Sequence, residues 1–198
     1  ADDGRGGLWI GRQDGLLHLD PESGAVRTTS TGLPGAIVRA VLRDHRGTLW
    51  VGSTGGLARR TAGSTAFAIE PAGGRGAAVS ALFEDQAGRI WIGTEQRGLF
   101  VIDRPGEAPH AFAAATPSLV GRVSSIAGSD AQHLWVGLRG GGIVSVDMRT
   151  GEVGTVRHDR TQPGSLAHND VWGLLSDNLG SLWAATSGGL SYAPRHSG

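Results

Sequence analysis

A short pattern that occurs five times limits the folds open to this chain more than any other feature. LWVGSTGGL at 49–57 is echoed by LWIGRQDGL at 8–16, IWIGTEQRGL at 90–99, LWVGLRGGGI at 134–143 and LWAATSGGL at 182–190. Successive tryptophans of the pattern are 41 to 48 residues apart. A period in the forties with several short strand signals is typical of a β-propeller blade. We therefore predict an all-β protein, a β-propeller of four-stranded antiparallel blades.

Each repeat can also be divided into strands. A short apolar run, such as residues 38–44, ends at a turn, DHRG at 44–47. Asp at the first turn position accepts a backbone hydrogen bond, and Gly at the fourth position tolerates positive φ. In the Trp strand that follows, alternation puts Leu49 and Val51 on one face and Trp50 on the other. A Gly-Leu strand and a weaker closing strand complete the unit.

The repeated tryptophan is interpreted as architecture rather than as five copies of a binding site. Sheets that are apolar on both faces must be covered on both faces, and stacked blades cover one another. A Trp in each unit would fill the space between blades, and the Gly after it would let a neighbour approach closely.

The repeats are expected near 1–37, 38–78, 79–122, 123–170 and 171–198. Five Trp strands and five Gly-Leu strands can be counted, but only four first strands and four closing strands. Three arrangements fit: an arc of a larger propeller, a five-bladed ring with two incomplete blades, or one piece of an assembled ring. An open arc by itself would leave blade faces exposed. Part of a larger propeller is therefore the favoured arrangement.

Composition excludes several classes of function. The 198 residues suffice for one domain. The formal net charge is zero and no basic run is present, so a nucleic-acid surface is not expected. The chain has no Cys, which excludes disulfides and thiolate chemistry. No apolar run approaches the ~20 residues of a membrane span, so we expect no membrane contact by this segment.

The repeat unit V-x-x-(I/L)-x-x-D-x-x-G-x-L-W-(V/I)-G-(T/S)-x-x-G-L resembles the two-component regulator propeller repeat. It is most complete at Val38–Leu57 and Val79–Leu99, and it occurs again at Val171–Leu190. Residues 157–183 resemble the linker of that family. Two copies depart from the pattern, because residues 129–133 lack the turn glycine and Ala184-Ala185 replaces Val-Gly. We expect those two blades to be distorted at the hairpin or less tightly packed.

The resemblance implies a function class. Such propellers are similar to the periplasmic sensor portions of membrane-bound bacterial regulators, whose output is a histidine kinase or a diguanylate cyclase. It implies a non-catalytic, periplasmic ligand-sensing module without a cofactor. Its partners would be a small polar or carbohydrate ligand and the downstream signalling domains of the same regulator, and self-association is also possible.

Ligand-binding residues are expected in the loops after the Trp strands, which differ between copies and would converge at one end of the channel. Mixed Arg, Glu, Gln and Asp side chains suit hydroxyl-rich or anionic ligands. The candidates in these loops are Arg12, Gln13, Asp14, Glu95, Gln96, Arg97 and Arg139, and the linker adds His168 and Asn169. The corresponding loops of the other copies hold Ser53-Thr54 and Thr186-Ser187. Trp172 lies outside the repeat register, and we predict a core-filling Trp in preference to a sugar-stacking platform.

Two alternatives to ligand sensing remain open. The first is a propeller lyase or hydrolase, similar to the streptogramin-degrading family, with a metal site at the channel mouth. Only His158-Asp159 and His168-Asn169-Asp170 have suitable chemistry for it, and we interpret them as capped turns of the linker. The second is a purely structural propeller that binds other proteins.

Overall fold

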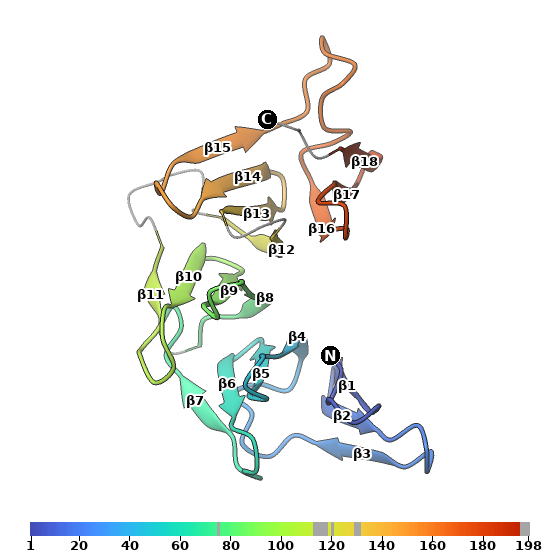
Figure 1. The fold of residues 1–198 in the computed structure, drawn as a ribbon, viewed down its shortest axis with the longest axis vertical. Helices are drawn as coiled ribbons and strands as arrows, with labels where there is room; N and C mark the ends of the chain where they lie inside the picture. Colours follow the sequence, from blue (N-terminus) through green and yellow to red (C-terminus); the bar gives the residue numbers. More distant parts are fainter. Residues whose placement is uncertain (75, 113–118, 120, 129–131, 195–198) are drawn as a thin grey trace.

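The computed structural model describes residues 1–74, 76–112, 119, 121–128 and 132–194. These residues form five antiparallel sheets and no α-helix. Figure 1 shows the sheets one after another along an open arc, with the first and last sheets at its two ends. Within the described part, no helix is long and apolar enough to cross a membrane. The prediction of an all-β propeller architecture is confirmed.

Each sheet is a meander in which strands adjacent in sequence pair with one another. The first sheet contains β1 (Leu8–Arg12), β2 (Gly15–Leu19) and β3 (Val26–Thr29). The second contains β4 (Val38–Arg43), β5 (Leu49–Ser53), β6 (Gly56–Arg60) and β7 (Ala68–Glu70). The third contains β8 (Val79–Glu84), β9 (Ile90–Thr94), β10 (Leu99–Ile102) and β11 (His110–Ala111). The fourth contains β12 (Val123–Gly128), β13 (His133–Leu138), β14 (Gly142–Asp147) and β15 (Val153–Val156). The fifth contains β16 (Val171–Ser176), β17 (Leu182–Thr186) and β18 (Gly189–Ala193).

The strand count follows the sequence pattern. Among the described residues, the three middle sheets are four-stranded and the two outer sheets are three-stranded. The first sheet has no named strand before its Trp strand, where only the bridge between Asp2 and Leu8 forms. The fifth sheet has no named strand beyond β18. Four first strands and four closing strands are therefore present in the described part, as predicted.

The turn aspartate does more than close the hairpin. Oδ1 of Asp85 accepts hydrogen bonds from the backbone N–H groups of Ala87 and Arg89, at 3.0 and 2.9 Å. Its Oδ2 accepts one from the indole N–H of Trp91, at 2.8 Å. The pairs Asp44–Trp50 and Asp177–Trp183 repeat the indole bond at 2.9 and 3.0 Å. Each such turn therefore fixes both its own backbone and the tryptophan of the strand that follows.

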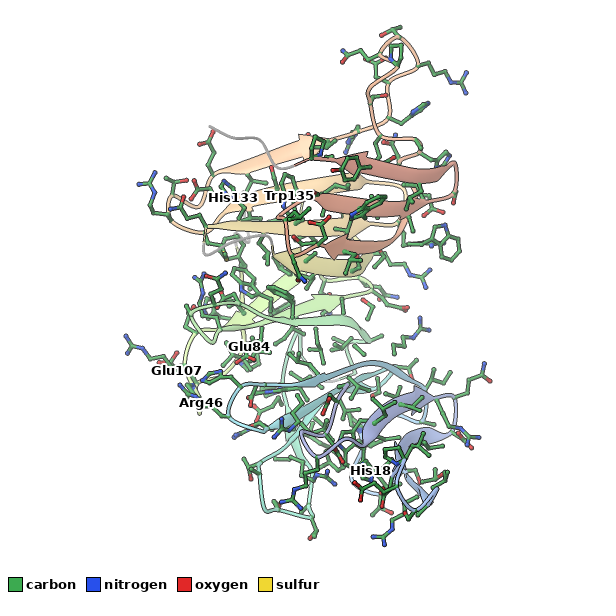
Figure 2. The ribbon with its side chains drawn as sticks, turned by 45° about the vertical axis from the view of Figure 1, so that its right-hand side comes forward. His18, Arg46, Glu84, Glu107, His133 and Trp135 are labelled. Carbon is green, nitrogen blue, oxygen red and sulfur yellow. The ribbon has the colours of Figure 1, made fainter. Side chains whose placement is uncertain are left out.

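In the middle sheets, the two faces of the Trp strand pack against different neighbours, as the alternation predicted. Leu49 and Val51 share a core cluster with Trp9 and Leu16 of the first sheet. Trp50 lies in the cluster that contains Val79 of the third sheet, with Ile90 and Ile92. In the same way, Figure 2 shows Trp135 of β13 beside the fifth sheet, and both belong to one cluster. The prediction that the tryptophans fill the space between blades is confirmed for Trp9, Trp50, Trp91 and Trp135.

In the first four sheets, the glycine two residues after the Trp makes this packing possible. A Cβ added at Gly52 would lie 2.6 Å from Cγ1 of Val79, the first residue of β8. The glycines of β1, β9 and β13 meet the first valine of the next sheet in the same way: Gly11 and Val38, Gly93 and Val123, Gly137 and Val171. A side chain at these positions would therefore force adjacent sheets apart, as predicted.

The last repeat keeps its hairpin intact, so of the two alternatives expected for it, distortion at the hairpin is wrong. Asp177 binds the backbone N–H groups of Leu179 and Ser181, and Gly180 has a φ of 80°. Hydrogen bonds from the Trp183 indole and from the Ser181 backbone hold the pKa of Asp177 below its ordinary value. The replacement of Gly by Ala185 lies far from this turn, at the other end of the strand. The second unusual turn includes residues 129–131, which lie outside the described residues.

Large apolar side chains are exposed on the outward faces of the first and last sheets. Leu175 and Leu190 of the fifth sheet are 63% and 65% exposed, whereas Leu57, which corresponds to Leu190, is fully buried. Leu8 and Ile10 of the first sheet are also exposed, although they correspond to buried residues of the middle sheets. Both faces occupy positions that pack against another sheet elsewhere in the molecule.

Candidate functional site

The loops that were expected to bind a ligand lie at the same end of each sheet. The backbone N–H of the loop residue donates to the carbonyl of the residue just before the first strand of the same sheet. These bonds are Thr54 to Ile37 at 3.0 Å, Glu95 to Ala78 at 3.0 Å, Arg139 to Arg122 at 2.9 Å and Ser187 to Asp170 at 3.0 Å. We call this end of the second to fifth sheets the rim. It comprises residues 37–39 and 53–54, 78–80 and 94–97, 122–124 and 138–139, and 170–172 and 186–187.

An irregularity of strand pairing occurs at the rim in each of these sheets. The ladder shifts register between the first valine of the first strand and the residue two positions later, as between Val38 and Ala40. The same shift occurs in the three following sheets. Such bulges redirect the extra residue out of the ladder. The residues at this position are Arg39, Ser80, Ser124 and Trp172.

Glu95 connects three consecutive sheets across the rim. Its Oε1 pairs with Nη1 of Arg39 in the second sheet at 2.6 Å. The same oxygen pairs with Nη2 of Arg122, which precedes the fourth sheet, at 3.1 Å. One carboxylate is therefore shared by two guanidinium groups.

A closed loop of four side chains occupies the rim between the fourth and fifth sheets. Nε of Arg139 pairs with Oδ1 of Asp170 at 3.0 Å, and Ser187 Oγ donates to Oδ2 of Asp170 at 2.7 Å. Ser187 Oγ also accepts from the indole N–H of Trp172 at 2.9 Å. The guanidinium carbon of Arg139 lies 3.2 Å from the centroid of the Trp172 ring, which completes the loop.

Trp172 is 58% exposed, so the prediction of a core-filling tryptophan is wrong. The residue follows Val171, which is fully buried at the fourth sheet, and the bulge separates their directions. Its ring is nevertheless fixed by Ser187 and Arg139. The rim therefore presents an aromatic surface that is both accessible and held in one orientation.

Gln96 and Arg97 line a separate pocket of about 220 Å³ between the second and third sheets. Thr54, Thr94 and residues 76–78 form the rest of its wall. Thr94 Oγ1 accepts the backbone N–H of Arg97 at 3.0 Å, which fixes the start of the turn. Both predicted residues are exposed and face this hollow at the rim.

The other predicted residues occupy different surroundings. Arg12 and Asp14 form an exposed ion pair at 2.9 Å on the turn of the first sheet, where Gln13 also lies. Asn169 Oδ1 accepts the backbone N–H of His158, and His168 Nδ1 accepts that of Asp170. Within the described residues, no hydrogen bond or ion pair joins these five candidates to Glu95, Gln96 or Arg97.

The histidines of the linker form hydrogen bonds with the backbone of the linker itself. His158 Nδ1 is 2.7 Å from the carbonyl oxygen of Leu166. Within the described residues, no group of three or more His, Asp or Glu side chains could hold a metal ion. The interpretation of this region as capped turns agrees with these contacts.

Sequence reasoning missed Arg39, Arg122 and Asp170 as members of the rim. The sequence did contain a sign of them, because each lies next to the valine that starts a first strand. The residues on both sides of that valine vary between repeats while the valine does not, as the residues of the predicted loops also vary. Only the stacking of sheets, however, brings residues 39, 95 and 122 to a single ion-paired group.

Comparisons with known proteins agree with this architecture. The profile of the family described as "Two component regulator propeller" matches residues 32–55 and 73–96. No curated protein sequence matches the chain. Among solved structures, the extracellular domain of the putative hybrid two component system BT4673 from B. thetaiotaomicron is similar, with a TM-score of 0.86 and 23% identity. The similarity covers 97% of this chain and 26% of that one.

Two further structures show the same arrangement of sheets. The extracellular domain of the putative hybrid two component system BT3049 from B. thetaiotaomicron has a TM-score of 0.82 and 28% identity, over 100% of this chain and 26% of that one. Virginiamycin B lyase from Staphylococcus aureus has a TM-score of 0.72 and 16% identity, over 98% and 67% of the two chains. The chain thus spans about a quarter of the two-component structures. The resemblance found in the sequence is confirmed at residues 32–55 and 73–96, and the described residues fold as consecutive sheets of a β-propeller.

Proposed function

We propose that the chain belongs to a non-catalytic, extracytoplasmic sensor module of a bacterial signal-transduction regulator, and that its rim binds a carbohydrate-like ligand. The similarity to extracellular domains of hybrid two-component systems supports the location and the class of protein. A periplasmic position and coupling to downstream signalling domains of the same regulator are part of this proposal.

The fixed and exposed ring of Trp172 is the observation that carries the proposed ligand class. An exposed indole is usually a binding surface when the protein immobilises it, because ordering a large side chain costs entropy. Asp170, Ser187 and Arg139 provide that immobilisation and add hydrogen-bonding groups at the edge of the ring. A sugar ring presents an apolar C–H face and a polar edge, which matches this surface.

The likeness to virginiamycin B lyase at 16% identity concerns the fold alone. The histidines that could have supplied a metal site are engaged in the linker, through Leu166 and the backbone N–H of Asp170. These contacts favour binding over catalysis as the task of the rim.

Trp172→Ala tests the proposal directly. We would measure binding of neutral and acidic oligosaccharides by calorimetry, and expect the substitution to weaken binding at least about tenfold, as loss of an aromatic anchor does. Leu179→Ala is the matched control, because Leu179 belongs to the same sheet and is more exposed, at 77%, but lies in the turn at the opposite end. It should leave binding unchanged.

Equal affinities of wild type and Trp172→Ala would contradict the proposed site. Binding of a protein partner but of no oligosaccharide would instead favour the structural interaction module.

A further inference from the structure

Positive charge is concentrated at the rim although the whole chain is neutral. The chain has 18 basic and 18 acidic residues. Within the described part of the rim, two carboxylates, Glu95 and Asp170, face a larger number of guanidinium groups. The arginines concerned are Arg39, Arg97, Arg122 and Arg139. The rim therefore attracts anions more strongly than the composition suggests.

The surplus charge is not spread evenly over these arginines. Arg139 has its own carboxylate in Asp170 and also stacks on Trp172. Arg39 and Arg122 share Glu95, so one positive charge of that group is left without a balancing negative charge. The remaining surplus belongs to Arg97.

Arg97 lines a cavity and has no acidic partner among the described residues. Among the residues that the structure describes, it forms no ion pair, and it lines the pocket of about 220 Å³ together with Thr54, Thr94 and Gln96. Its guanidinium lies over the turn at Gly74, where an added Cβ would be 3.2 Å from Nη1. Gly74 has a φ of 87°, so the turn passes close beneath the arginine without a side chain of its own.

This pocket suits a small oxyanion. A guanidinium presents two N–H donors in a fixed fork that matches carboxylate or sulfate oxygens, and such charge-assisted pairs are stronger than neutral hydrogen bonds. Gln96 adds an amide that can donate to the same group. A neutral ligand would leave the charge of Arg97 unpaired.

We propose that the Arg97 pocket binds the anionic substituent, a carboxylate or a sulfate, of the ligand that the rim recognises. The inference rests on the proposed function, because it assigns a second contact of the same ligand-binding rim. It predicts that acidic oligosaccharides bind better than their neutral counterparts.

The test uses four forms of the protein: wild type, Arg97→Gln, Arg97→Lys and Arg27→Gln. Arg27 is exposed on β3 of the first sheet and also lacks an ion pair within the described residues, so its substitution changes the net charge equally. The probes are tetragalacturonate and its fully methyl-esterified form, with a sulfated chondroitin disaccharide and its unsulfated form as the sulfate pair. Affinities are measured at low and at physiological ionic strength.

In wild type we expect an acidic probe to bind at least about tenfold more tightly than its neutral partner, a preference that declines as salt screens the charges. Arg97→Gln should abolish that preference, and Arg97→Lys should retain part of it because the charge remains but the fork is lost. Arg27→Gln should retain all of it. The acidic probe that shows the preference identifies carboxylate or sulfate as the group bound.

Three results would overturn the inference. If Arg97→Gln and Arg27→Gln reduce the preference equally, the effect is one of overall charge. If acidic and neutral probes bind alike and only Trp172→Ala weakens them, the proposed function stands and the anion pocket does not. If no probe binds wild type, both proposals are contradicted.

Discussion

At the scale of single residues, the turn aspartates link two features that the sequence presents separately. The carboxylate of Asp85 holds the tight turn and the indole of Trp91, and both groups are buried. A buried donor that loses its acceptor costs about 1–3 kcal/mol, and more where the acceptor is charged. The recurrence of Asp six residues before Trp is therefore explained by one carboxylate serving two purposes.

Asp85→Ala should lower the free energy of unfolding by about 3 kcal/mol. It leaves the indole N–H of fully buried Trp91 and the guanidinium of Arg89 without their acceptor, while the turn loses its backbone bonds. Urea unfolding followed by tryptophan fluorescence measures the change. Asp20→Ala is the control, since Asp20 caps an exposed turn and binds no indole. A loss no larger for Asp85→Ala than for Asp20→Ala would contradict the double role.

Sequence reasoning reached only part of this arrangement. The turn positions of Asp44 and Gly47 were predicted because turn chemistry is local. The hydrogen bond that the Trp50 indole donates to Asp44 was not predicted, although an Asp stands six residues before the Trp in four repeats. The first repeat shows why the spacing alone does not predict the bond to the indole. Asp3 stands six residues before Trp9, yet its Oδ2 pairs with His18 at 2.7 Å.

At the scale of secondary-structure elements, close approach between sheets depends on a valine fitting against a glycine. Val79 begins β8 and is fully buried, with its Cγ1 at the position that a Cβ of Gly52 would crowd. Because Gly52 does not have a positive φ, the constraint is space rather than backbone conformation.

Gly52→Ala should therefore destabilise the protein by about 1–3 kcal/mol, the usual cost of overpacking a core. Gly173→Ala is the matched control in strand β16, where no atom lies within 4 Å of an added Cβ and φ is not positive. That substitution should be neutral or slightly stabilising. Chemical denaturation gives both values.

A double-mutant cycle then identifies the neighbour responsible. Val79→Ala alone removes buried volume, but in the Gly52→Ala background it also relieves the clash, so the double variant should be more stable than the sum of the single losses predicts. Strictly additive losses would show that Gly52 is constrained by something other than Val79.

Elements were more predictable than the site that they form. The strands could be placed because alternation and turn signals recur in register, as for β5 and β9. The accessibility of Trp172 could not, because it depends on which face of β16 the bulge presents and on whether another sheet covers it. Likewise, the convergence of Arg39 and Arg122 on Glu95 follows from stacking, which brings together residues far apart in sequence.

At the scale of the whole molecule, the two end faces are complementary halves of the contact that joins neighbouring sheets. Leu175 corresponds to Leu42 and Phe83, which pack against the next sheet, and Leu190 corresponds to buried Leu57. Leu8 and Ile10 correspond to Leu49 and Val51, which pack against the preceding sheet. Exposed apolar surface of this kind marks an interaction site.

The chain should accordingly associate head to tail, with the first sheet of one copy on the fifth sheet of another. Such a contact joins two different surfaces, so it continues to further copies unless the arrangement closes. Light scattering over a range of concentrations should give a mass that rises above that of a single chain. Leu175→Glu combined with Leu190→Glu should return it to the mass of one chain, because burying two carboxylates in the contact is unfavourable.

Leu179→Glu separates this contact from general stickiness. Leu179 is exposed in the turn and off the sheet face, so its substitution adds charge without touching the proposed contact and should leave the association unchanged. If Leu179→Glu lowers the measured mass as much as the combined Leu175→Glu and Leu190→Glu variant does, association is not specific to the face of the fifth sheet. If wild type has the mass of one chain at every concentration, then the two faces are covered within a single chain, and the arc closes in solution. Head-to-tail association is the expected result, since the residues at the equivalent positions of the middle sheets are packed against a neighbouring sheet.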